Sequence, residues 1–267
     1  MALRSLKDIT LGQYSPGNSW IHRLDPRTKL FACFMLMIWI LLIHEAGLLV
    51  FFFFTGLILY RFSKLSILIA LKNIRPFVWL FLITLVLHSV FTPGKSLFKI
   101  PYTSIMISHE GLSGGLFYTC RILILITVAN LLTLTTAPMS LTDAIERFLR
   151  PFQKWRIPAH EIAMMMSIAI RFIPILLEEM QRIQKAQESR GARFEGNLVE
   201  RIKSVLPILI PLFLSAFRRA NDLALAMDAR CYQGGEGRIS YDELNFKKHD
   251  LLAMGVILGL GIPVFIL

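Results

Sequence analysis

Two arginine-centred hexapeptides are the residues of this chain whose types and spacing best suit a specific interaction. Ala186–Gly191 reads A-Q-E-S-R-G and Ala226–Cys231 reads A-M-D-A-R-C, so both follow the order alanine, any residue, acidic, small, arginine, small. Small neighbours leave Arg190 and Arg230 accessible, and a guanidinium binds a carboxylate with two parallel hydrogen bonds. A single copy would be explained more simply as a helix end, where arginine offsets the helix dipole and glycine permits a left-handed turn. Two copies favour docking of each arginine into an acidic groove on a partner.

Each hexapeptide lies at the end of a predicted long amphipathic helix, the first over residues 158–191 and the second over residues 198–230. Along the first helix, apolar residues recur at alternating steps of four and three, which places them on one face. The members of this stripe that we expect to contact a partner or the membrane bundle are Ile162, Met166, Ala169, Ile173 and Leu176. Pro174 in the first helix, and Pro207 and Pro211 in the second, are expected to bend them.

The composition indicates the class of protein to which these helices belong. Of the 267 residues, 55% are apolar and 18% are charged, and the mean hydropathy is +0.58. Because a soluble domain has about 25% charged residues, an integral membrane protein is predicted. The net charge of +11 would suggest nucleic-acid binding in a soluble protein. Cytoplasmic loops of membrane proteins also collect lysine and arginine, however, so no nucleic-acid partner is expected.

Residues that could catalyse a reaction or hold a cofactor are scattered along the sequence. Cys33, Cys120 and Cys231 form no C-x-x-C pair, and the six histidines show no metal-binding spacing. The tripeptide G-K-S at Gly94–Ser96 ends like a phosphate-binding loop, but Ser89 stands where that motif requires a glycine. We therefore expect no cofactor, no metal site and no ATP hydrolysis by this chain itself.

The apolar runs predict an all-α integral membrane protein with about five transmembrane helices plus long amphipathic cytoplasmic helices. The predicted spans are residues 30–43, 46–60, 77–91, 112–137 and 251–267. The predicted domains are a cytoplasmic N-terminal segment (1–29), a four-span membrane domain (30–137), a domain of amphipathic helices (138–248) and a C-terminal transmembrane helix (249–267).

Basic residues in the short loops predict the orientation in the cell membrane. Arg23, Arg27 and Lys29 precede the first span, and residues 61–75 between the second and third spans contain further arginines and lysines. The loop at residues 92–110 is poor in basic residues. The positive-inside rule therefore places the N-terminus, the 61–75 loop and the amphipathic helices in the cytoplasm.

Several segments together resemble the transmembrane T component of energy-coupling factor (ECF) transporters, the ABC-type importers of vitamins and some metal ions. These segments are G-Q-Y-x-x-G-x-S-x-x-H-R-L-D-P-R-T-K-L at Gly12–Leu30, Thr135–Thr136 with Leu141–Thr142, Arg171–Pro174 with Glu178–Glu179, Ala186–Gly191, and Ala229–Arg230. The resemblance implies that residues 138–248 form a coupling-helix domain and that two ABC-type ATPase subunits dock on its helix ends. The residues implied in that docking are Ser189, Arg190, Gly191, Ala229, Arg230 and Cys231.

The function implied by this resemblance is a transmembrane scaffold that transmits ATP-driven motion to a membrane-embedded, substrate-binding S component, whose contact would be the apolar stripe. The alternative is a permease that binds solute itself between its helices, which requires polar groups near the middle of several spans. Arg121 and His88 are the main candidates for such groups. Arg121 is expected to face a protein interior or to extend towards the membrane surface, because a lipid-facing charge is costly. A membrane-bound lipid enzyme is less favoured, since no catalytic cluster is evident.

The predicted orientation can be tested by labelling single cysteines in a background without the native cysteines. We expect Ser96→Cys to react with a membrane-impermeant thiol reagent added to whole cells, because the 92–110 loop is predicted to be external. Ser189→Cys should react only after the cells are opened. The reverse pattern of labelling would contradict the orientation.

Overall fold

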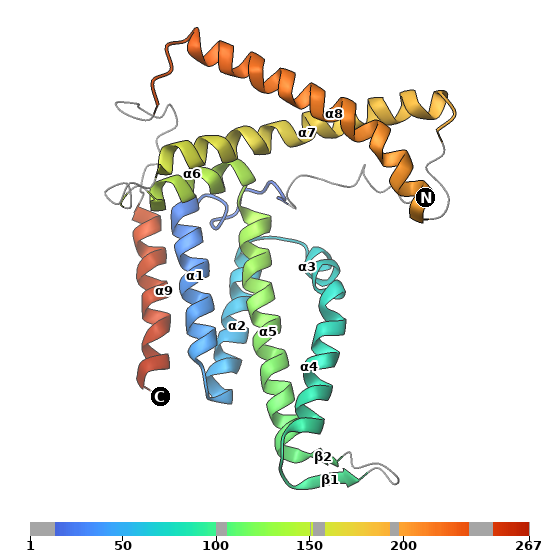
Figure 1. The fold of residues 1–267 in the computed structure, drawn as a ribbon. Coiled ribbons are helices and arrows are strands. Elements are labelled where there is room, and N and C mark those ends of the chain that lie inside the picture. Colours follow the sequence, from blue (N-terminus) through green and yellow to red (C-terminus); the bar gives the residue numbers. More distant parts are fainter. Residues whose placement is uncertain are drawn as a thin grey trace. The chain divides into compact units, whose positions relative to one another are not determined.

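The computed structural model describes residues 14–99, 106–149, 151, 158–192, 198–234 and 248–266, and the regular structure in these residues is almost entirely helical (Figure 1). The helices are α1 (Pro26–Leu42), α2 (Ala46–Phe62), α3 (Ile67–Ile74), the 3-10 turn η2 (Arg75–Phe77), α4 (Val78–Phe91), α5 (His109–Thr135), α6 (Pro138–Leu149), α7 (Ala159–Ser189), α8 (Leu198–Asp228) and α9 (Lys248–Ile266). The all-α prediction is confirmed. A small antiparallel hairpin of β1 (Ser96–Lys99) and β2 (Met106–Ser108), and the helix α6, were not predicted.

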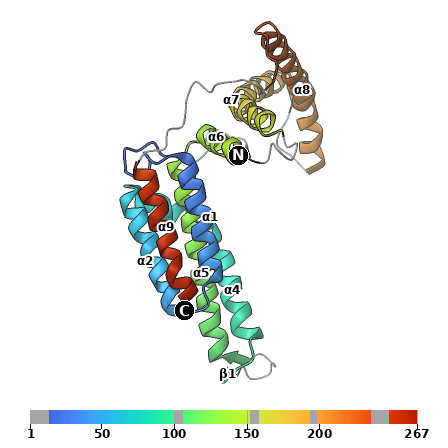
Figure 2. The ribbon, with the colours of Figure 1, turned by 90° about the vertical axis from the view of Figure 1, so that its left-hand side faces the viewer.

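Contacts between residues divide the chain into two compact units. One unit, here called the membrane unit, contains residues 12–144 and 242–267, and the other, the helix-pair unit, is built mainly from residues 145–241. In the membrane unit α1 packs between α5 and α9, α2 packs on α5, and α4 runs along α5 (Figures 1 and 2). In the helix-pair unit α7 packs against α8.

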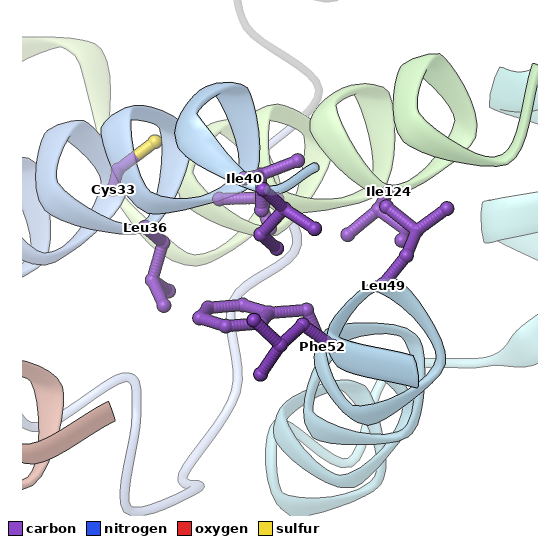
Figure 3. Close-up of a cluster of buried hydrophobic side chains, with 9 residues drawn as sticks. Cys33, Leu36, Ile40, Leu49, Phe52 and Ile124 are labelled. Atoms are coloured by element: carbon purple, nitrogen blue, oxygen red, sulfur yellow. The ribbon is translucent and has the colours of Figure 1, made fainter. Parts of the chain in front are cut away.

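The core of the membrane unit is an apolar cluster where α1, α2 and α5 meet. Ile40 is fully buried, and Phe52 from α2 and Ile124 from α5 are each 2% exposed. Figure 3 shows the Phe52 ring lying beneath Ile40, with Leu49 beside Ile124. Residues on the remaining faces of these helices are largely exposed within the chain, as expected of helices that contact lipid.

Two glycines four residues apart allow α5 to approach α4 closely. A Cβ atom on Gly111 would lie 2.5 Å from the carbonyl oxygen of His88, and one on Gly115 would lie 3.1 Å from the carbonyl oxygen of Leu85. Small residues at this spacing are typical of membrane helices whose backbones touch, because packing rather than hydrophobic burial drives their association. Glycine is therefore required at the α4–α5 contact, because a larger side chain would clash with the backbone of α4.

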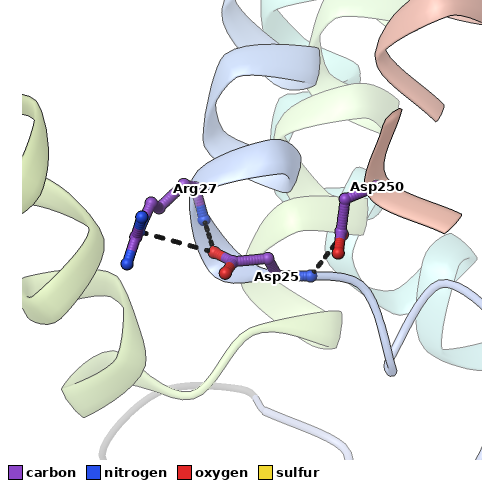
Figure 4. Close-up of polar contacts among 3 residues, drawn as sticks. All are labelled: Asp25, Arg27 and Asp250. Carbon is purple, nitrogen blue, oxygen red and sulfur yellow. Dashed lines mark hydrogen bonds and ion pairs between the residues drawn. The ribbon is translucent and has the colours of Figure 1, made fainter. Parts of the chain in front are cut away.

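Buried polar groups join the beginnings of α1 and α9 to the end of α5. The Asp25 side chain caps α1 by accepting from the Arg27 amide (2.9 Å), and the Asp25 amide donates to the Asp250 carboxylate (2.8 Å; Figure 4). The Lys29 ammonium donates to the carbonyl of Thr135 at 2.9 Å. These side chains are each less than 10% exposed, so breaking one contact would leave a buried polar group unsatisfied.

Within the part of the chain that the structure describes, three helical stretches are long and apolar enough to cross a membrane: Leu68–Phe91, His109–Thr135 and His160–Ser189, with shorter apolar helices at Ala46–Phe62 and His249–Phe265. The third stretch belongs to α7, which the sequence analysis predicted to be an amphipathic helix outside the bundle. Between Ile162 and Leu177 its one charged residue is Arg171, whereas residues 178–190 include six. Length and apolar composition suit either a span or an apolar face that packs on another protein.

The glycine contact between α4 and α5 predicts a difference between two neighbouring substitutions. Gly111→Ala should lower the apparent Tm of the purified chain by about 2–10 °C, since the added methyl overlaps the backbone of α4. Gly114→Ala is the matched control, because a Cβ there meets nothing within 4 Å. Thermal unfolding in detergent measures both, and equal Tm values for the two variants would contradict the proposed contact.

Candidate functional site

The helix α7 ends at the first arginine hexapeptide in a tight hydrogen-bonded turn. The Gly191 amide donates to the Glu188 carbonyl (3.0 Å), and the Ala192 amide donates to the Gln187 carbonyl (3.0 Å). Gly191 has a φ of 87°, in the left-handed region that favours glycine. This pair of bonds is a Schellman motif, in which backbone amides satisfy the last carbonyls of the helix.

The helix α8 ends at the second hexapeptide in the same motif. The Cys231 amide donates to the Asp228 carbonyl (2.9 Å), and the Tyr232 amide donates to the Met227 carbonyl (3.1 Å). The left-handed residue is Cys231, with a φ of 55°, rather than a glycine. The sequence repeat is therefore also a structural repeat, because each arginine occupies the position just before a left-handed residue.

The backbone turns leave both arginine side chains available to a partner. Because amides of the turn cap the helix carbonyls, neither guanidinium is needed for that purpose. Within the described part of the chain, Arg190 and Arg230 make no side-chain hydrogen bond or ion pair. The predicted docking residues that the structure leaves exposed are Ser189, Arg190, Gly191, Ala229, Arg230 and Cys231.

The two arginine-bearing ends are separated by the length of the helix pair. The helices α7 and α8 contain 31 residues each, so each is about 45 Å long. They cross rather than run parallel, and their C-terminal ends lie on opposite sides of the crossing (Figure 1). An ion pair between Arg219 and Glu179 (3.4 Å) links them. Both helices continue through their prolines without a break, and α8 changes direction in its first half (Figure 1).

The predicted stripe on α7 is incompletely covered within the chain. Ala169 and Ile173 are exposed, and Ile162, Met166 and Leu176 are half-buried. A second and more exposed apolar face lies on α8 and was not predicted from the sequence. Its members, each more than half exposed, are Leu206, Ile210, Phe213 and Phe217. They are spaced four, three and four residues apart, which places them on one face of the helix.

The two residues considered for a solute site have partners inside the membrane unit. The Arg121 guanidinium donates to the Ile43 carbonyl at the end of α1 and lies 4.8 Å from the centre of the Phe117 ring. The His88 ring nitrogen Nδ1 is 3.0 Å from the Thr84 carbonyl oxygen, and the ring stacks near Tyr118. Arg121 thus faces protein, as predicted, and these contacts give the permease alternative little support.

The G-K-S tripeptide spans the end of the turn before β1 and Ser96, the first residue of that strand. The Lys95 amide donates to the Glu110 carboxylate at 2.7 Å. A phosphate-binding loop directs such amides at an anionic ligand, whereas this amide is used by an acidic side chain of the protein. Among the described residues, no group of three or more His, Cys, Asp or Glu side chains is placed to hold a metal ion.

Comparison with known proteins gives a consistent family. Residues 17–241 match the family described as CbiQ, cobalt transport protein. A protein of Acidaminococcus fermentans named energy-coupling factor transporter transmembrane protein EcfT is 51% identical over 259 residues, covering 96% of this chain and 95% of the relative. Proteins of the same name from Ruminiclostridium cellulolyticum (45% identical, 94% of each chain) and Listeria innocua (41% identical, 96% and 97%) are also similar. The chain belongs to the CbiQ/EcfT family.

As a member of the CbiQ/EcfT family, the chain is a transmembrane component of an energy-coupling factor transporter. The resemblance inferred from the sequence is therefore confirmed. The family match covers both arginine hexapeptides and the whole of α7 and α8, so the duplicated helix end belongs to the part of the chain that defines the family.

The two Schellman turns predict opposite effects of two substitutions. Gly191→Ala should speed hydrogen exchange of the amides at 191 and 192 at least about fivefold, because a left-handed conformation costs a non-glycine residue about 1–2 kcal/mol. Space is not the cause, since a Cβ on Gly191 meets nothing within 4 Å. Cys231→Gly should slow exchange at Tyr232 by a similar factor. Unchanged exchange in both variants would show that these turns do not stabilise the helix ends.

Proposed function

We propose that this chain is the scaffold and coupling subunit of an ECF-type ABC importer. It transmits ATP-driven motion of two ABC-type ATPase subunits to a membrane-embedded S component that binds a vitamin or another micronutrient. The observation that carries this proposal is the structural repeat at the ends of α7 and α8, where two exposed arginines occupy equivalent positions. Two equivalent ends suit two equivalent partners.

Each arginine-bearing end supplies what docking into an acidic groove requires. Backbone amides already satisfy the helix carbonyls, so a partner does not have to compete with the chain for the guanidinium. Small neighbours such as Ser189 and Ala229 let a groove close around the helix end. A hydrogen-bonded arginine at the centre of an interface commonly contributes far more than one at its rim.

The two long, crossed helices α7 and α8 are suited to transmit motion from their ends. When ATP draws the two ATPases together, the ends of α7 and α8 move with them, and the crossing at Arg219 and Glu179 transmits the motion along both helices. A continuous helix moves as a unit because every turn is hydrogen-bonded to the next. Hydrolysis itself is assigned to the partner subunits, and this chain contributes no catalytic residue.

The apolar faces of the helix pair are the proposed contact for the S component. Ala169 and Ile173 on α7, with Phe213 and Phe217 on α8, present uncovered apolar surface that a soluble helix pair would have to bury. The S component is itself a membrane protein, so its apolar exterior can cover these faces. The cytoplasmic placement of the two arginine ends follows the orientation predicted from the loop charges.

Charge reversal at the two helix ends tests the docking proposal. Arg190→Glu and Arg230→Glu should each reduce substrate uptake strongly, since a carboxylate would then face the acidic groove and loss of such a contact costs about 2–5 kcal/mol. The double variant should lose both ATPase subunits on purification. Uptake by whole cells and co-purification from native membranes measure the two effects.

Matched controls are available on the same two helices. Arg182 and Arg218 are exposed but lie before the final turns, so Arg182→Glu and Arg218→Glu should retain the ATPase subunits. All variants should reach the membrane at normal levels. Retention of both ATPases by the Arg190→Glu, Arg230→Glu double variant would refute docking through these arginines.

A charge on the apolar face of α7 should separate the two kinds of partner. Ala169→Asp should weaken retention of the S component, because the carboxylate would be buried without a partner. ATPase binding should persist, since the helix ends are unchanged, and Ala169→Leu should retain both partners. Quantification of each subunit after affinity purification checks the outcome. If Ala169→Asp holds the S component as firmly as the unmodified chain, the face has another role.

A further inference from the structure

A hollow of about 440 Å³ lies in the membrane unit at the turn between α2 and α3. Its walls include Leu57, Tyr60 and Arg61 from α2, Lys64 from the turn, and Leu68 from α3. Two cationic side chains therefore border a cavity whose other walls are mainly apolar. This combination suits an amphiphile with an anionic head.

The two cations at this hollow have no acidic residue near them in the sequence. Between Ala46 and Ser108 the sequence contains no aspartate and no glutamate. Arg61 and Lys64 are exposed, and within the described residues neither side chain makes a hydrogen bond or an ion pair. Their charge is thus available to an external anion.

The turn that carries the two cations is held by internal hydrogen bonds. The Ser63 hydroxyl, which is 1% exposed, donates to the Tyr60 carbonyl (2.7 Å), and the Tyr60 hydroxyl donates to the Ser66 carbonyl (3.1 Å). Lys64 has a φ of 56° and so adopts the left-handed conformation that the tight turn requires. The turn therefore keeps a strained residue, and its backbone places Arg61 and Lys64 at the hollow.

The position of the hollow along α2 matches the level of lipid headgroups. The helix α2 is apolar along its length until Arg61 in its last turn, where a membrane helix meets the phosphate region. Leu57, one turn before Arg61, is 48% exposed, and Leu68 on α3 is 76% exposed. An acyl chain can follow these leucines while the headgroup phosphate contacts Arg61 and Lys64.

We propose that this hollow is a binding site for an anionic phospholipid, with Arg61 and Lys64 holding the phosphate and Leu57 and Leu68 contacting an acyl chain. The site is separate from the two arginine helix ends and does not depend on their function. Its ligand is a lipid rather than free phosphate, because the lining beside the two cations is mainly apolar.

Native mass spectrometry of the full chain in detergent tests the site, with palmitoyl-oleoyl-phosphatidylglycerol and the matching phosphatidylcholine as probes. The unmodified chain should bind phosphatidylglycerol preferentially. Arg61→Gln with Lys64→Gln should lower the affinity of the first phosphatidylglycerol about 25-fold, at roughly fivefold for each charge removed. Arg61→Lys with Lys64→Arg, which keeps both charges, should retain the preference.

The control removes the same charge from a neighbouring position outside the hollow. Lys72→Gln with Arg75→Gln should leave the affinity within about twofold of the unmodified chain, because neither side chain lines the hollow. Equal losses in the two neutralised variants would show a diffuse electrostatic effect and overturn the site, as would the absence of any preference for phosphatidylglycerol. Displacement of bound phosphatidylglycerol by millimolar inorganic phosphate would overturn the assignment to a lipid.

Discussion

The last carbonyl groups of α7 and α8 must be hydrogen-bonded, and the way the chain does this determines what Arg190 and Arg230 are free to do. A Schellman turn at each end satisfies the carbonyls with backbone amides alone. The arginine therefore is not required as a cap, and its charge remains available for a partner. The left-handed residue that closes each turn, Gly191 or Cys231, thus leaves the neighbouring arginine free for the proposed docking.

The membrane unit depends on close packing instead of on charge. Glycines at 111 and 115 bring α5 against α4, and Ile40, Phe52 and Ile124 fill the space between α1, α2 and α5. Some of its buried polar groups are hydrogen-bonded to one another, as in the contact of the Asp25 amide with the Asp250 carboxylate. Arg121 is likewise used to bind a carbonyl at the end of α1. In a solute-binding permease, polar side chains of the membrane helices would instead be directed into a cavity.

Apolar runs and helical periodicity were sufficient to predict most of the fold, because a membrane allows few ways to satisfy the backbone. They predicted α1, α2, α4, α5, α7, α8 and α9 close to their observed bounds. The hairpin β1–β2 and the short α6 were missed, since neither has a long apolar run. The arginine hexapeptides could be located from their repeat, but Cys231 as a left-handed residue could not, because cysteine carries no preference for that conformation. The exposed face of α8 was missed because the middle of this helix is apolar on all sides. Its sequence therefore does not indicate which side remains uncovered.

The central claim is that the two arginine-bearing ends each contact an ATPase subunit. Site-specific photo-crosslinking in native membranes tests this most directly, with a photoreactive residue placed at Ser189 or at Ala229 and, for comparison, at the exposed Met165 on the apolar face of α7. We expect positions 189 and 229 each to form an adduct with an ATPase subunit, and position 165 to form one with a different, membrane-embedded protein. Adducts of positions 189 and 229 with lipid or with this chain alone would refute contact of the two helix ends with the ATPase subunits.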